Sequence, residues 1–69
     1  TAEDVAVLAS VLTGGEDYES AKETLLDALE RFPSDADRFL SLGYAVVEAT
    51  GDRSFRDQLT ARQTGRGTG

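Results

Sequence analysis

The chain has 69 residues, no cysteine, no histidine and a formal net charge of −6. That length allows one small domain, which buries only about 60% of the surface of its unfolded chain and is marginally stable by itself. Without cysteine and histidine it lacks disulfides, thiolate metal ligands and the commonest nucleophiles and general bases. We therefore expect no enzymatic activity, no catalytic residue, and no bound cofactor or metal. Oligomerisation or a protein partner is the stabilising device that remains for so small a fold.

The charges are unevenly distributed. Residues 1–50 carry eleven acidic and three basic side chains, whereas residues 51–69 carry two acidic and four basic ones. Nucleic-acid binding needs a basic face that neutralises phosphates, which the acidic part does not offer. No run of about eighteen apolar residues is present that could insert into a membrane. We therefore expect a soluble protein that does not bind nucleic acid and does not insert directly into a membrane, with the cytoplasm as the favoured compartment. The acidity serves either solubility alone or contact with a neutral or basic protein surface.

Two helices are predicted in the first half of the chain. Thr1 is a candidate N-cap, with Asp4 three residues later as in a capping box. This first helix should end near Thr13, before two glycines that readily adopt left-handed conformations. Asp17 is a candidate cap for the second helix, which Pro33 ends. The apolar residues of the second helix recur at spacings of three and four and form one face: Tyr18, Ala21, Leu25, Leu26, Ala28, Leu29 and Phe32.

A third helix is predicted after the proline. Ser34 is a candidate cap, with Asp37 three residues later, for a helix that continues to about Thr50. Gly51 is the expected C-cap, because glycine adopts the left-handed conformation at low cost. The connections between predicted helices are short, so consecutive helices should pack as antiparallel neighbours.

The fourth segment, about residues 52–63, is a weaker helix whose large apolar residues are Phe55 and Leu59. Residues 64–69 carry no apolar side chain, and we expect them to form a disordered tail after a single domain over 1–63. The sequence therefore predicts an all-α fold of about four helices arranged as antiparallel hairpins.

The chain also resembles itself when its second half is aligned with its first. Val5, Leu8, Ala9 and Leu12 then match Phe39, Leu42, Gly43 and Val46. The second helix continues the pattern with Ala21 and Leu25, closed by Pro33. The pattern and its period of about 34 residues resemble the tetratricopeptide repeat, a helix–turn–helix unit. The resemblance comprises one full repeat over about residues 2–35 and a degenerate second one, since Arg62 stands where the family has a small residue.

The resemblance implies a right-handed stack of hairpins that acts as a protein–protein interaction module or as a scaffold subunit of a larger complex. In this family the first helix of each hairpin lines a concave groove, which here implies Ala6 and Ser10 as protein-binding residues. The third predicted helix is apolar nearly all round, and Leu40, Tyr44 and Val47 form a second stripe on it. Either this stripe binds a protein partner or a second copy of the chain, or it packs beneath the fourth helix or the N-terminal segment. Another small helical bundle is the alternative fold, and a self-associating regulatory protein is the alternative function.

Overall fold

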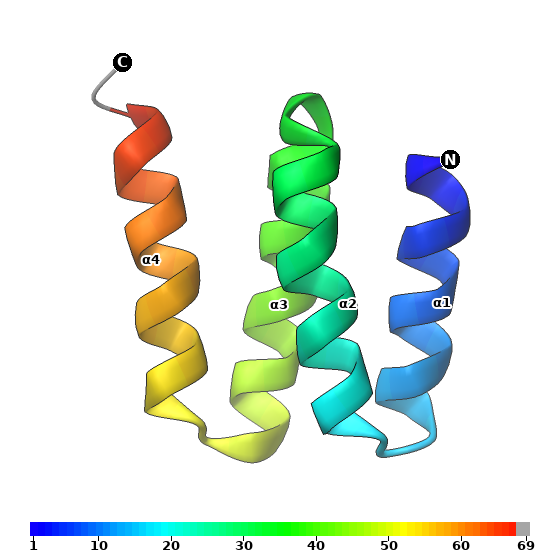
Figure 1. The fold of residues 1–69 in the computed structure, drawn as a ribbon. Helices are drawn as coiled ribbons and strands as arrows, with labels where there is room; N and C mark the ends of the chain where they lie inside the picture. Colours follow the sequence, from blue (N-terminus) through cyan, green and yellow to red (C-terminus); the bar gives the residue numbers. More distant parts are fainter. Residues whose placement is uncertain (68–69) are drawn as a thin grey trace.

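The computed structural model describes residues 1–67, with side chains described through residue 62 (Figure 1). Within these residues four α-helices follow one another, and a short 3₁₀ helix joins the second to the third. They are α1 (Ala2–Gly14), α2 (Tyr18–Arg31), η1 (Pro33–Asp35), α3 (Ala36–Thr50) and α4 (Arg53–Gly67). Each α-helix runs antiparallel to the one before it. The predicted all-α fold of antiparallel helices is thereby confirmed.

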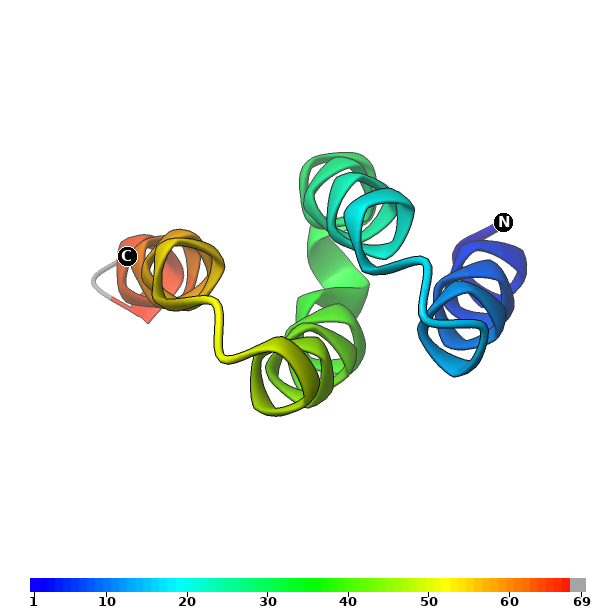
Figure 2. The ribbon, with the colours of Figure 1, turned by 90° about the horizontal axis from the view of Figure 1, so that it is seen from below.

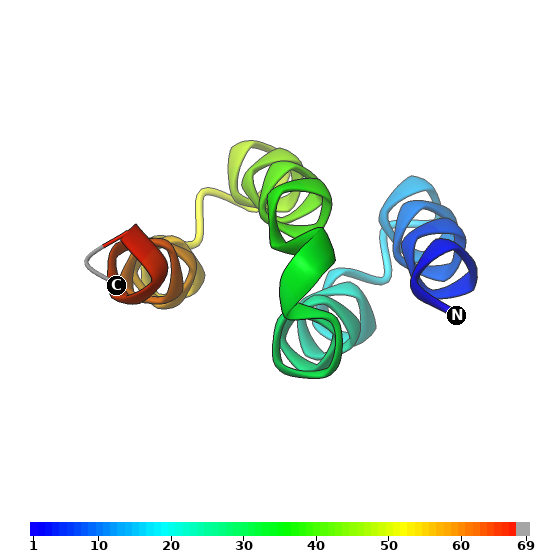
Figure 3. The ribbon, with the colours of Figure 1, turned by 90° about the horizontal axis from the view of Figure 1, so that it is seen from above.

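Viewed along their axes, the helices form a zigzag (Figures 2 and 3). α2 packs against α1 and α3, α3 packs against α2 and α4, and α1 also contacts α3. α1 and α4 lie at opposite ends of the array and are covered from one side only. The array measures 36 × 28 × 14 Å, so its thinnest dimension is little more than the roughly 10–12 Å diameter of one helix. Because α2 and α3 each have neighbours on two sides, they are the best covered helices of the array.

The core lies where α2 and α3 meet each other and the end helices. Its buried residues are Ala9, Ala21, Leu25, Ala28, Leu29, Ala36, Phe39, Leu40, Val46, Phe55 and Leu59. The apolar face predicted for the second helix is confirmed, because Ala21, Leu25 and Ala28 are fully buried. Phe32, at the end of α2, is half-buried, and its ring centroid lies 6.1 Å from that of Phe39.

The start of α1 agrees with the sequence, but the turn after it differs. The Asp4 N–H donates to Thr1 Oγ1 at 3.3 Å, within the predicted capping box. After α1 the left-handed residue is Glu16, with φ 63°, and neither of the two glycines before it. The Glu16 N–H donates to the Thr13 carbonyl at 3.1 Å and the Asp17 N–H to the Leu12 carbonyl at 2.8 Å. This pair of bonds is the Schellman motif, which places Glu16 at the position that requires a positive φ.

The boundaries of α3 agree with the sequence at one end only. Ser34 does not cap this helix, because Pro33–Asp35 forms a 3₁₀ turn and Asp35 becomes the N-cap residue, without a side-chain cap bond. Gly51 ends α3 with φ 71° and donates its N–H to the Val47 carbonyl at 2.6 Å, as its predicted capping role requires.

α4 begins one residue later than predicted and is longer. Asp52 caps it, because Asp52 Oδ1 accepts the Phe55 N–H at 3.1 Å. The helix continues to Gly67, past the predicted end at residue 63. The tail predicted over residues 64–69 thus includes four helical backbone positions, and residues 68–69 lie outside the described residues.

The self-similarity of the sequence is also present in the helix positions. α1 begins at Ala2 and α3 at Ala36, which the repeat alignment places on each other. Ala9 and Gly43, the aligned small residues, are both buried. Leu8 and Leu42 are also aligned, but Leu8 is exposed, with half of its surface accessible, whereas Leu42 is less exposed and packs against the core. Leu8 therefore lies largely outside the core, on a side of α1 that none of the described helices covers.

Candidate protein-binding surface

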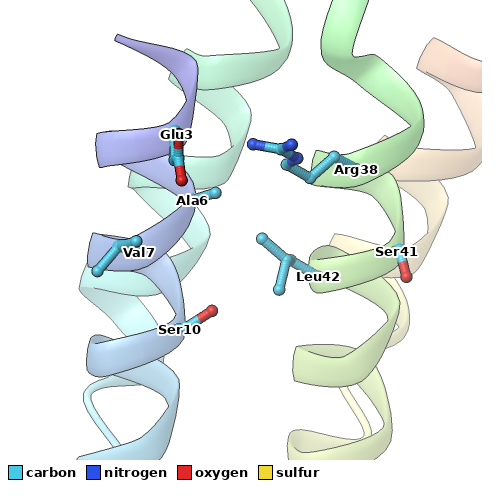
Figure 4. A pocket seen from close by; sticks show the side chains of 7 residues that line it. All are labelled: Glu3, Ala6, Val7, Ser10, Arg38, Ser41 and Leu42. Carbon is cyan, nitrogen blue, oxygen red and sulfur yellow. The ribbon is translucent and has the colours of Figure 1, made fainter.

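A shallow groove separates α1 from α3, with α2 behind the two helices in the view of Figure 4. It encloses about 420 Å³. Its lining comes from two helices only: Glu3, Ala6, Val7 and Ser10 of α1, and Arg38, Ser41 and Leu42 of α3. We call this feature the α1–α3 groove.

The groove has a charged end and an apolar middle. Arg38 extends from α3 toward α1, and Glu3 lies on the α1 wall, both near the amino-terminal ends of their helices (Figure 4). Further along, Ala6 and Leu42 point into the space between the helices, and the Ser10 hydroxyl lies on the α1 wall. The arrangement offers an apolar contact next to a carboxylate and a guanidinium, which suits a protein segment better than a small apolar molecule.

The predicted protein-binding residues do not share one surface. Ala6 and Ser10 both line the α1–α3 groove. Leu40, in contrast, is 5% exposed and belongs to the core. Val47 and Tyr44 are half-buried against that core, and the Tyr44 hydroxyl lies 3.4 Å from Thr60 Oγ1 of α4. The chain itself therefore covers Leu40 almost completely, and Tyr44 and Val47 in part.

The reason lies in the geometry of repeated helices. The repeat alignment pairs Ser10 with Tyr44, and such equivalent positions point in the same direction from their own helices. The two walls of a groove face each other, so they are built mostly from positions that are not equivalent; Val7 and Ser41, which the alignment pairs, both line the groove. The α3 wall is accordingly formed by Arg38, Ser41 and Leu42, on a different side of α3 from Tyr44. These three residues could have been identified from the sequence as the side of the third helix that faces the first.

A second surface feature, which was not predicted from the sequence, is a group of exposed apolar side chains on α1. Val7, Leu8 and Val11 of α1 are 58%, 50% and 64% exposed, respectively. Their spacing places them on one side of the helix, next to the groove that Val7 also lines. We call these three residues the exposed α1 face. The sequence carried a signal for it, since the first helix, like the third, is apolar nearly all round.

One ion pair holds α2 against the turn between α3 and α4. Lys22 Nζ lies 2.5 Å from Asp52 Oδ2, and their side chains are 17% and 29% exposed. The hydrogen bond from Lys22 lowers the pKa of Asp52, and the same bond raises the pKa of Lys22. Because Asp52 also caps α4, this contact positions the last helix.

A metal site and a membrane-spanning helix are both absent from the described part of the chain. No group of three or more acidic side chains there is arranged to hold a metal ion. None of its helices has both the length and the apolar character that crossing a bilayer requires. Comparison with protein-family models, with curated proteins and with solved structures finds no match. The groove and the exposed α1 face are thus the surface features on which a function can be argued.

Proposed function

We propose that this chain is a tetratricopeptide-like protein–protein interaction module, or a small scaffold subunit of a larger complex. It binds a protein partner through the exposed α1 face and the α1–α3 groove beside it. The proposal rests chiefly on one observation, the exposure of three large apolar side chains next to one another on α1. Contiguous apolar surface of this kind is typical of sites of protein interaction.

The energetic scale supports a contact of moderate strength. Complete burial of a Val or Leu side chain is worth about 1.5–3 kcal/mol, and the three residues of the exposed α1 face are already about half covered. Covering the remainder should therefore contribute roughly 1 kcal/mol per side chain. That is enough to drive association when the groove supplies further contacts, and too little for tight binding by itself.

The repetition of the helices supports the family assignment. α1 begins at Ala2 and α3 at Ala36, one repeat later, and each helix buries a small residue, Ala9 or Gly43, at the aligned position. In the tetratricopeptide family the binding groove runs along the first helices of consecutive hairpins, which is the place of the α1–α3 groove here. The chain also has no histidine or cysteine, which favours a binding role over a catalytic one.

Site-specific crosslinking tests the proposal. A photo-reactive benzophenone side chain is placed at Ser10 in the groove or, as a control, at exposed Glu23 of α2, in cells that make this protein. One partner protein should be captured reproducibly by the side chain at position Ser10, and that protein should not be captured at position Glu23. Val11→Ser in the Ser10 background should reduce capture at least tenfold, which corresponds to about 1.4 kcal/mol, while the helical circular dichroism signal stays the same. Equal capture from both positions, or none from Ser10, would refute the proposed surface.

A further inference from the structure

The exposed α1 face is bordered by acidic side chains at both ends. Glu3 and Asp4 lie in the first turn of α1, and Glu16 and Asp17 follow its last turn. All four are exposed. Residues 1–17 contain no Lys or Arg, and the last turn of α1 has no basic residue to balance the negative end of the helix dipole. The exposed α1 face thus has an apolar centre with negative charge at either end, while Arg38 is a cation on the α3 wall of the groove beside it.

We infer that the occupant of this surface is a basic amphipathic helix of a protein partner. The inference rests on the proposed function and adds the chemistry of the partner to it. The apolar stripe of such a helix would cover the exposed α1 face, and Lys or Arg on both sides of the stripe would meet the acidic ends of α1. The rise of about 1.5 Å per residue puts Asp4 roughly 15 Å from Gly14, the last residue of α1, and Glu16 follows in the turn just beyond that end. The two cationic groups of the partner should therefore be separated by about ten to twelve helical residues.

The charge pattern disfavours a second copy of this chain as the occupant. Because α1 is acidic at both ends, two α1 helices packed side by side bring carboxylates together whether they run parallel or antiparallel. Each chain also carries a net charge of −6, which adds long-range repulsion. Lys22, the first basic side chain along the chain, lies on α2 and is already engaged in an ion pair with Asp52.

Binding of two synthetic peptides tests this inference. One peptide is an amphipathic helix with a leucine stripe between two lysine groups about twelve residues apart, and its twin carries glutamate in place of each lysine. Titration followed by fluorescence anisotropy should give at least tenfold tighter binding of the lysine peptide. Glu3→Gln with Glu16→Gln should weaken that binding about tenfold and reduce its dependence on salt. The matched control, Glu23→Gln with Glu48→Gln, changes the net charge equally at exposed positions on α2 and α3 and should leave affinity within twofold.

The outcomes separate this inference from the proposed function. An equal loss in the control variant would mean that overall charge attracts the peptide, and would overturn the inference. Binding of both peptides with equal affinity, weakened by Val11→Ser, would reject a basic partner and leave the α1 surface as a binding site. Binding of neither peptide would also overturn the inference. In that case, sedimentation that detects a dimer sensitive to Val11→Ser would identify a second copy as the occupant.

Discussion

The close approach of α3 and α4 depends on the missing side chain at Gly43. A Cβ atom at this position would lie 2.7 Å from Leu59 Cδ1 and 2.9 Å from Leu59 Cδ2. Leu59 is fully buried, so its side chain has little space into which to rotate. Overpacking of this kind costs about 1–3 kcal/mol, whereas replacing a glycine inside a helix by alanine gains about 0.8–1 kcal/mol. The steric cost is the larger, and we expect Gly43→Ala to lower the free energy of unfolding by about 1 kcal/mol.

Leu59→Ala provides the second background for this test. It removes both Cδ atoms that would meet the new Cβ and should itself cost about 2–5 kcal/mol. In that background Gly43→Ala meets no obstruction at Leu59, so the gain in helix propensity should appear as a stabilisation of about 1 kcal/mol. The effect of the same substitution should therefore change sign, with a coupling free energy of about 2 kcal/mol between the two positions.

Urea unfolding followed by circular dichroism at 222 nm measures all four members of this cycle. An osmolyte such as sucrose, present throughout, keeps the destabilised variants folded at zero urea. Gly14→Ala in α1 is the matched control, because a Cβ at Gly14 has no neighbour within 4 Å and should not be destabilising. If Gly43→Ala stabilised the protein in both backgrounds, the contact between Gly43 and Leu59 would not limit the approach of α3 and α4.

Three further predictions follow from burial, backbone conformation and charge. Leu25→Ala should cost about 2–5 kcal/mol because Leu25 is fully buried, whereas Leu8→Ala, at a half-exposed position, should cost about 1 kcal/mol or less; equal costs in urea unfolding would contradict the assignment of the core. Glu16→Gly should raise the free energy of unfolding by about 0.5–1 kcal/mol and thereby raise the melting temperature. The reason is that glycine relieves the strain of the positive φ, and this gain exceeds the cost of a more flexible unfolded chain. A lower melting temperature would argue against the left-handed turn. Asp52→Asn keeps a side-chain oxygen for the cap and removes the charge that pairs with Lys22. The pKa of Asp52 is lowered below its ordinary 3.8, so its stabilisation is present above that pH and is lost as the pH falls through the lowered pKa. The pKa of Lys22 is raised above its ordinary 10.5, so its stabilisation is present below that pH and is lost as the pH rises through the raised pKa. The difference in melting temperature between the wild type and Asp52→Asn should therefore be steady from about pH 5 to 9 and shrink at both extremes; a difference independent of pH would show that the ion pair does not contribute.

The sequence alone determined the local features of this protein. The capping box at Thr1, the apolar face that includes Leu25 and the left-handed cap at Gly51 depend on residues within a few positions of one another. Helical periodicity and capping are short-range effects, so they can be predicted before the partner of any helix is known. Local prediction failed at two turns, where alternative turn conformations compete. Ser34 does not cap α3 because Pro33–Asp35 forms a 3₁₀ turn, and Glu16, instead of a glycine, adopts the left-handed conformation after α1.

The tertiary structure decided which apolar surfaces are covered. The first and third helices are both apolar nearly all round, and nothing in their own residues distinguishes a face that packs from a face that remains exposed. α3 lies in the middle of the array, so Leu40 is buried and Tyr44 packs toward α4. α1 lies at one end, so Val7 and Val11 face away from the core. Burial depends on how many neighbours a helix has, and that number follows from the order of the helices in space.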